Sequence, residues 1–373
     1  MGAIMGGRAV VAVLCVVGLL AAPGAVAAEW GGPVVGVSPS SAVTAVLAAA
    51  SPAGFSDAVV GSVDLPTGLV FTPDGRMLVI TKPGHLLVVE EGEPNQVALD
   101  LSSRVCSEKE LGLVGIAVDP DFETNGFVYL YYTDHGGGTC TAEGGDDLSN
   151  RVGRFVLNGD NTVDPASETV IVDHIVAPGA HHIAGDLEFG ADGFLYISVG
   201  DGVCTVVGPS QCGPTNNNSQ RLRVPHGKIL RVGRNGGPAP TNPYVGEPGA
   251  RRCTDPAGIP AGTGPCKEIF ASGFRNPFRF ARMPGTSTFY VNDVGMHTWE
   301  EVNRLAKGKN YGWNVREGSC ARDSTTNCGS VAPYRNPIYD YPHTTGCTAI
   351  TGAAFVPNGI WPAAYTGSLI YAD

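Results

Sequence analysis

Residues 186–197, with the sequence DLEFGADGFLYI, show the pattern that decides the fold. Apolar and polar residues alternate up to a Gly-Ala-Asp-Gly turn, and a second run rich in aromatic and β-branched residues follows it. Glycine tolerates the positive φ of a tight turn, and an aspartate there bonds its own backbone. The stretch therefore predicts a β-hairpin.

The same pattern of strand, turn and strand recurs along the chain, at residues 68–80, 115–132, 278–291 and 351–371. Hairpins that repeat with long polar loops between them are typical of propeller blades. No helical pattern separates the strands, which argues against βαβ units. We predict an all-β protein whose residues 55–373 form a β-propeller, with a β-sandwich as the alternative. Because the chain stops on a strand, we expect the last blade or blades to be incomplete.

Residues 1–28 have the composition of a secretory signal peptide. Arg8 supplies a positive charge, the apolar run 9–22 is shorter than the roughly 20 residues of a membrane span, and 25–27 form a small-residue cleavage site. We predict a secreted, extracellular protein without a stable membrane span; an uncleaved anchor is the alternative. Residues 29–54 are rich in small residues and predict a linker or N-terminal arm, with a short helix within it as the alternative.

Composition excludes several classes of protein. Lys and Arg number 24 against 35 Asp and Glu, a net charge of −11, so nucleic acid is not an expected partner. A hydrophobic fraction of 43% is ample for a packed core. The chain has no Gly-x-Ser-x-Gly elbow, Walker loop or Gly-x-Gly-x-x-Gly motif, which argues against a serine hydrolase, a nucleoside triphosphatase and an NAD enzyme.

The cysteines agree with export. Cys15 lies in the predicted signal peptide, and the other nine include no Cys-x-x-Cys, so a zinc ribbon is not expected. Cys347 is left without an obvious partner and is a free thiol, an intermolecular link, or a residue whose partner lies beyond Asp373. The spacing of the others favours four disulfides: Cys106–Cys140, Cys204–Cys212, Cys253–Cys266 and Cys320–Cys328.

Two polar motifs precede predicted inner strands. His181 and His182 come just before the hairpin at 186–197, and an imidazole at the mouth of a propeller funnel can act as a general base. The alternative is a histidine bonded to a backbone carbonyl. Arg275 precedes Asn276 and a proline at another strand start, where its guanidinium can bind a carboxylate or carbonyl; the alternative is a solvated surface turn.

Residues 293–303 and 308–314 combine adjacent acids, glycine turns and amides, which are suitable oxygen ligands for calcium. The alternative is a solvated acidic loop. Residues 119–126 begin like an EF-hand loop, but Thr124 stands where that loop needs Gly and Leu130 where it needs Glu. We therefore interpret 119–126 as a hairpin loop.

Taken together, these motifs resemble the soluble quinoprotein glucose/sorbosone (aldose sugar) dehydrogenases, which are six-bladed β-propellers that use pyrroloquinoline quinone (PQQ) and calcium. The resemblance covers residues 54–373. It rests on short motifs in the same order: 65–68, 73–76, 112–115, 119–122, His182-x-x-Gly185, 192–193, 200–201, 227–232, 273–277, 300–303 and 310–313.

The resemblance implies roles for the polar residues around the cofactor. His182 matches the base that takes the proton of a sugar's anomeric hydroxyl while hydride passes to the quinone. Arg275 and Asn276 match residues that hold the quinone and polarise its reacting carbonyl. Glu110 stands where the glucose enzymes have a substrate-binding glutamine, and with His181 it is our candidate substrate contact.

The resemblance also implies two calcium sites. The backbone carbonyls of Gly295 and Met296 match the ligands of the ion that activates the cofactor, although the glucose enzymes have proline in place of Met296. Glu301 and Tyr311 match a second, structural site. The family's cofactor-binding Lys and Arg come from its last blades, and this chain ends before any matching position.

These expectations give a functional prediction and two alternatives. We predict a PQQ-dependent sugar dehydrogenase that oxidises the anomeric carbon of an aldose to a lactone, with a small sugar as substrate and an external electron acceptor as partner. The first alternative is a non-catalytic, calcium-stabilised extracellular propeller that binds glycans or proteins, since Hedgehog-interacting-type domains resemble the same family. The second is a calcium-dependent lactonase on a six-bladed propeller.

Overall fold

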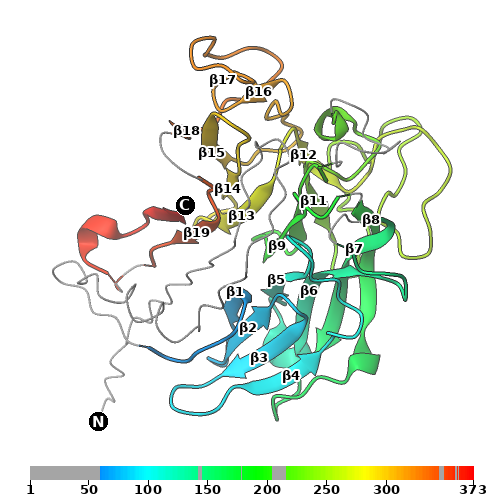
Figure 1. Cartoon of the computed structure of the whole chain (residues 1–373), viewed down its shortest axis with the longest axis vertical. Helices are drawn as coiled ribbons and strands as arrows, with labels where there is room; N and C mark the ends of the chain where they lie inside the picture. The colour runs from blue at the N-terminus through cyan, green and yellow to red at the C-terminus, as the bar shows by residue number, and fades with distance from the viewer. Residues whose placement is uncertain are drawn as a thin grey trace, which may run out of the picture.

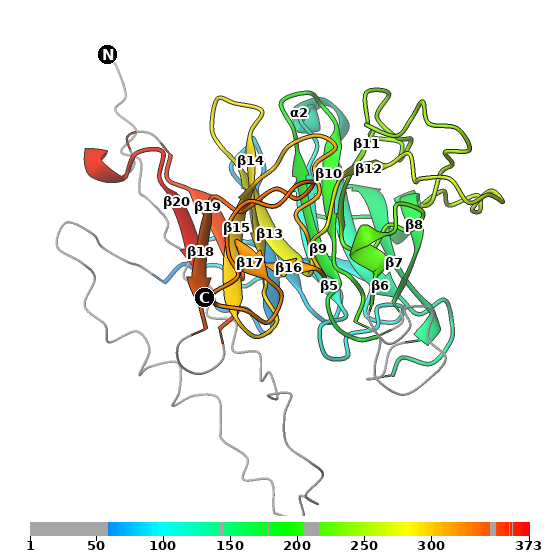
Figure 2. The ribbon, with the colours of Figure 1, turned by 90° about the horizontal axis from the view of Figure 1, so that it is seen from above.

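The computed structural model describes residues 59–141, 145–177, 179–203, 216–343, 348–357, 359 and 361–373. Its strands form antiparallel sheets that radiate side by side around a common axis, as the blades of a propeller do (Figure 1). Figure 2 shows the sheets standing beside one another, with the C-terminal strands β19 (Gly352–Phe355) and β20 (Leu369–Ala372) at one side and β7 (Gly145–Val156) and β8 (Thr169–Ala177) at the other. The all-β propeller is therefore confirmed, and a sandwich of two facing sheets is not what forms.

Within the residues that the structure describes, four blades have four strands each, and a fifth has two. Blade 1 contains β1 (Pro66–Phe71), β2 (Met77–Thr81), β3 (His85–Val89) and β4 (Gln96–Asp100), and blade 2 contains β5 (Leu113–Val118), β6 (Phe127–Asp134), β7 (Gly145–Val156) and β8 (Thr169–Ala177). Blade 3 contains β9 (Ala184–Phe189), β10 (Leu195–Val199), β11 (Lys228–Val232) and β12 (Ile269–Ser272), and blade 4 contains β13 (Pro277–Arg282), β14 (Phe289–Asp293), β15 (Trp299–Arg304) and β18 (Tyr339–Pro342). Blade 5 contains β19 (Gly352–Phe355) and β20 (Leu369–Ala372), and a separate hairpin contains β16 (Arg316–Glu317) and β17 (Cys320–Ala321).

In the described part of the chain, helical structure is confined to short segments: α2 (Phe122–Asn125) and the 3₁₀ turns η1 (Pro165–Ser167), η2 (Asn218–Gln220) and η3 (Ala363–Tyr365). The segment 119–126, which the sequence predicts as a plain hairpin loop, thus contains one helical turn. Its Phe122 is buried against the core of blades 1 and 2, which stabilises the turn. Among the described residues, no helix is long and apolar enough to cross a membrane.

The core lies between neighbouring blades. Tyr129 of blade 2 meets Phe189 of blade 3 edge to face, with ring centroids 5.1 Å apart, inside a cluster shared by these blades. Each buried aromatic ring removes a large apolar surface from water, so contacts of this kind hold consecutive sheets together. The inner strands β1, β5, β9, β13 and β19 also contact one another in chain order around the axis.

The inner hairpins share an irregular register at one end. The register shifts between Pro66 and Gly68 in β1, between Leu113 and Gly115 in β5, and between Pro277 and Arg279 in β13. The β9–β10 pair has a corresponding shift between Ile197 and Val199. Bulges bend a strand and redirect its side chains. These lie at the ends of the inner strands where His182 and Arg275 are placed.

Three predicted disulfides are confirmed: Cys106–Cys140, Cys253–Cys266 and Cys320–Cys328. Disulfides are typical of oxidising compartments. The predictions of a signal peptide at 1–28, a linker at 29–54, a Cys204–Cys212 pair and a Cys347 without an obvious partner all fall outside the described residues.

Candidate active site

His182 lies in the segment leading into β9, with its backbone held on both sides. Its φ of 53° is in the left-handed region, which costs free energy for a side chain with a Cβ. Its N–H donates to Glu110 Oε2 at 2.7 Å, and its carbonyl accepts the N–H of Gly202 at 3.2 Å. The surrounding contacts therefore fix this unfavourable conformation and, with it, the direction of the imidazole.

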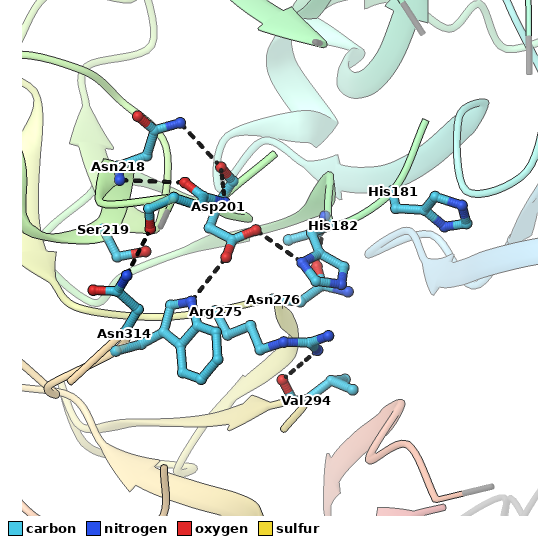
Figure 3. Close-up of polar contacts among 12 residues, drawn as sticks. His181, His182, Asp201, Asn218, Ser219, Arg275, Asn276, Val294 and Asn314 are labelled. Atoms are coloured by element: carbon cyan, nitrogen blue, oxygen red, sulfur yellow. Dashed lines mark hydrogen bonds and ion pairs between the residues drawn. The ribbon is translucent and has the colours of Figure 1, made fainter. Parts of the chain in front are cut away.

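A buried carboxylate sets the tautomer of His182. Its Nδ1 lies 2.8 Å from Oδ1 of Asp201, which is 1% exposed. Because a carboxylate only accepts hydrogen bonds, Nδ1 carries the proton and Nε2 presents a lone pair. Trp313 Nε1 donates to the second oxygen of Asp201 at 2.8 Å, so both carboxylate oxygens are engaged (Figure 3). This is the arrangement of an oriented general base.

Arg275 lies next to this pair. The N–H of Asp201 donates to the Arg275 carbonyl at 2.7 Å, and the Arg275 guanidinium stands over the Trp313 ring, 5.6 Å from its centroid. Figure 3 shows the imidazole of His182 and the guanidinium of Arg275 on the same side of Asp201. The structure therefore brings together the predicted base and the predicted cofactor-binding cation, although they come from different blades.

The Arg275 side chain is only partly satisfied by the protein. One terminal nitrogen donates to the Val294 carbonyl at 3.0 Å, while Nε is buried without a hydrogen-bond partner among the described residues. Asn276 is more committed, because its Oδ1 accepts the N–H of Ala184 at 3.1 Å. A planar anionic cofactor fits Arg275, whereas Asn276 has only its side-chain amide N–H groups and the remaining acceptor capacity of Oδ1 to offer.

Glu110 and His181 form a second pair beside the base. His181 Nδ1 lies 3.1 Å from Glu110 Oε1, and the other oxygen of Glu110 binds the His182 backbone. Burial acts to raise the pKa of Glu110, but the hydrogen bond from His181 and the two imidazoles hold it below its usual value. An ionised Glu110 thus positions the backbone of His182, which the sequence did not predict for it; its predicted contact with substrate stays a prediction.

The predicted calcium loop connects β14 to β15 and wraps around carboxylates. The Gly295 N–H donates to Glu300 Oε2 at 3.3 Å, and the next N–H groups donate to Glu317 Oε1. A Cβ on Gly295 would lie 1.7 Å from the Trp299 carbonyl oxygen, so only glycine fits there. The loop conformation therefore depends on this glycine and on carboxylates from β15 and β16.

A cavity of about 10 Å³ lies beside this loop, between Arg275 and the acidic residues. That volume suits a single water molecule or ion. It is lined by Arg275, Asp293, Val294, Gly295, Trp299, Glu301, Trp313, Arg316 and Glu317. Two predicted cofactor and metal residues, Arg275 and Gly295, therefore share one cavity with Glu301, which the resemblance assigns to a different calcium ion.

Two acids at this cavity, Asp293 and Glu301, are unfavourable in their ionised forms. Burial raises the pKa of Asp293 to about 7, although its oxygens accept the N–H groups of Arg275 and Asn276. Burial and the nearby Asp293 raise the pKa of Glu301 well above its usual value. One oxygen of Glu317 is buried without a partner among the described residues. Carboxylates in such a position favour a bound cation, and their oxygens are ligands that calcium accepts.

The other predicted metal ligands, Met296 and Tyr311, do not line this cavity. Met296 is 42% exposed, whereas the Tyr311 hydroxyl donates to the Arg304 carbonyl and the Tyr311 ring stacks on Phe274. Among the described residues, no group of three or more His, Cys, Asp or Glu side chains is arranged as a metal site. A calcium ion here would need backbone carbonyls, as the sequence predicts for Gly295 and Met296.

Two residues that complete the site were not predicted. Asp201 stands in a Gly-Asp-Gly motif after β10, and a buried Asp at that position could have been paired with His182 from the motif order alone. Glu317, in β16, lies outside every motif that we identified. Only its contacts with the β14–β15 loop reveal it.

The glucose/sorbosone dehydrogenase family matches residues 63–372. The chain belongs to this family. The match covers all five described blades and the site residues described above.

Individual relatives support the same conclusion. The chain is 28% identical to the aldose sugar dehydrogenase YliI of Escherichia coli over 253 residues, covering 67% of this chain and 59% of that protein. It shares its fold with the PQQ-bound aldose sugar dehydrogenase of Streptomyces coelicolor, with a TM-score of 0.56 and 24% identity over 75% of this chain and 69% of that one. The human Hedgehog-interacting protein is 32% identical over 158 residues, covering 40% of this chain and 22% of that protein. The chain thus spans less than two-thirds of the length of these curated relatives.

Proposed function

We propose that this chain is a PQQ-dependent dehydrogenase that oxidises the anomeric carbon of an aldose to a lactone. The observation that carries the proposal is the His182 imidazole, whose Nδ1 is held by buried Asp201 and whose Nε2 is left to accept a proton beside Arg275. An oriented imidazole next to a cation, at the mouth of a propeller in this family, suits removal of a proton and a hydride from one carbon–oxygen unit.

In this reaction His182 Nε2 accepts the proton of the anomeric hydroxyl, and the carbon–oxygen double bond of the lactone forms as the hydrogen on that carbon leaves with its electron pair. Asp201 stabilises the imidazolium that results, because its carboxylate lies 2.8 Å from Nδ1. PQQ, when bound, would supply the two-electron acceptor, and calcium would supply Lewis-acid activation of it. An external electron acceptor would be needed for turnover.

The residues present fit that cofactor in part. Arg275, whose Nε is buried without a partner among the described residues, would hold the quinone, and Asn276 would add its amide N–H groups. The carbonyls of Gly295 and Met296 would hold the activating calcium, and Glu301 would lie close to it. For Tyr311 we propose only a backbone contribution to a second calcium site, since its hydroxyl is already bonded within the protein.

We also propose that the protein acts outside the cytoplasm. The three disulfides support this, and so does the composition of residues 1–28. The substrate would be a small aldose, and neither nucleic acid nor a membrane span has a part in the proposal.

The test is direct. The purified chain is supplied with PQQ and Ca²⁺, and reduction of a redox dye is followed as a panel of aldoses is added. We expect aldose-dependent reduction that needs both PQQ and calcium. If PQQ does not quench the protein's tryptophan fluorescence and no aldose reduces the dye, the proposal is wrong.

One alternative has its own support, because the chain is similar to the human Hedgehog-interacting protein over part of its length. A non-catalytic propeller would keep a calcium-dependent thermal stability and show no PQQ binding. The same two measurements therefore separate the alternatives.

A further inference from the structure

One oxygen atom of Glu317 organises the whole β14–β15 loop. Glu317 is 4% exposed, and its Oε1 accepts four consecutive backbone N–H groups. The donors are Met296 at 2.8 Å, His297 at 2.9 Å, Thr298 at 2.8 Å and Trp299 at 3.1 Å. Successive N–H groups that converge on one anion form a nest, which fixes the orientation of every peptide unit that takes part.

The orientation of these N–H groups determines where the carbonyls point. In a trans peptide the N–H and C=O of one unit point in opposite directions. The Met296 N–H belongs to the same peptide unit as the Gly295 carbonyl, and the His297 N–H to the same unit as the Met296 carbonyl. Neither bond is among the cis peptides of the described chain. Both carbonyl oxygens therefore point away from Glu317.

We propose that Glu317 is a positioning residue for calcium: its carboxylate turns the Gly295 and Met296 carbonyls outward as a pair of ligands. This inference rests on the proposed function, in which those two carbonyls hold the ion. Glu317 binds the N–H side of these peptide units, and the ion would bind their carbonyl side. Groups of this kind outside the ligand shell commonly change metal affinity by 10- to 100-fold when they are removed.

Charge adds to the effect of geometry. Four N–H donors that converge on one oxygen favour a negatively charged carboxylate. Its second oxygen is buried without a partner among the described residues, and the residue lines the cavity that Glu301 and Gly295 also line. A fixed negative charge behind the loop attracts a cation in front of it.

The chain offers a matched control. Glu268 is completely buried in blade 3, and both of its oxygens accept the Cys253 N–H at 3.1 Å. It resembles Glu317 in binding backbone N–H groups, but it does not line the cavity. Loss of either carboxylate should lower stability, whereas only loss of Glu317 should change calcium binding.

The experiment measures calcium affinity without PQQ. Tb³⁺ is bound to the calcium-free full chain, its luminescence is excited through Trp299 and Trp313, which line the cavity, and Ca²⁺ is titrated to displace it. We expect Glu317→Ala to raise the calcium Kd by about 10-fold or more. Glu317→Gln keeps an acceptor oxygen without the charge and should fall between wild type and the alanine variant. Glu268→Gln should bind as wild type does.

Each outcome decides a separate question. Suppose that the wild-type chain binds calcium and that the Glu317→Ala and Glu317→Gln variants, both folded, bind it with the wild-type Kd. The inference is then overturned, while the proposed function stands. If Glu317→Ala does not fold, Glu317→Gln carries the test alone. If calcium displaces no Tb³⁺ from the wild-type chain, both the inference and the calcium part of the proposed function are wrong.

Discussion

Two clusters of buried polar groups meet where β9 and β13 begin, and they are stabilised in opposite ways. On one side Asp201 has both oxygens engaged, by His182 and by Trp313. On the other side burial raises the pKa of both Asp293 and Glu301, and the nearby Asp293 raises that of Glu301 further. The first cluster is satisfied by the protein alone and is set for proton transfer. The second gains stability from a bound cation, so the two halves of the site should respond to different perturbations.

The largest expected effect tests the first cluster. His182→Ala removes the proton acceptor, and general bases contribute about 10²- to 10⁴-fold to rate, so we expect kcat for aldose-dependent dye reduction to fall by that factor. Calcium-dependent stability should stay as in wild type, because the second cluster is intact. Steady-state kinetics and a melting curve on the same preparation measure both.

Two further variants sharpen this result. Asp201→Asn keeps the shape of the carboxylate and removes its charge, so its activity should lie between those of wild type and His182→Ala. His181→Ala alters the neighbouring imidazole, which is bonded to Glu110 rather than to Asp201. Comparable losses of kcat in His181→Ala and His182→Ala would contradict the assignment of His182 as the base.

The next effect tests the second cluster. Calcium that binds only the folded chain stabilises it by about 2.7 kcal/mol at a free concentration of 100 Kd, so chelation with EGTA should lower Tm by about 5 °C. Glu301→Gln should reduce this difference, because the neutral amide no longer opposes Asp293. Differential scanning fluorimetry with and without calcium measures it. If EGTA lowers Tm equally in Glu301→Gln and in wild type, calcium binds elsewhere.

The fold was predictable because its signals are local. The turn Gly190–Gly193 and the alternation on either side of it specify the β9–β10 hairpin, in which Phe189 pairs with Leu195. Repetition of that signal then indicates the propeller. The helical turn α2 was not predicted, because it depends on the burial of Phe122 between blades rather than on residues 119–126 themselves.

The site was predictable only as separate residues. Family motifs identified His182 and Arg275, but neither motif states that Trp313 bonds Asp201 from another blade. Glu317 could not be identified at all, because its role is defined by four backbone N–H groups distant from it in sequence. Contacts made by main-chain atoms leave no residue type for a sequence pattern to show.

The smallest expected effect lies away from both clusters and tests whether buried acids always need a cation. Burial and the nearby Asp186 raise the pKa of Glu188 to about 8, and its side chain remains 33% exposed. Since the folded chain keeps this proton up to about pH 8 and the unfolded chain loses it near 4.5, its contribution to stability is present below pH 4.5 and is lost as pH rises to 8.

Glu188→Gln should therefore flatten the fall in unfolding free energy between pH 5 and pH 8, by about 1 kcal/mol once solvent screening is included. Urea denaturation at the two pH values, with 1 mM EGTA present, measures the change, and Glu91→Gln at an exposed turn is the control. If Glu188→Gln and wild type lose stability equally over this range, its proton is not held by burial. If calcium alone abolishes the slope, Glu188 belongs with the cation-dependent acids, and the contrast between the two clusters is not confined to the mouth of the propeller.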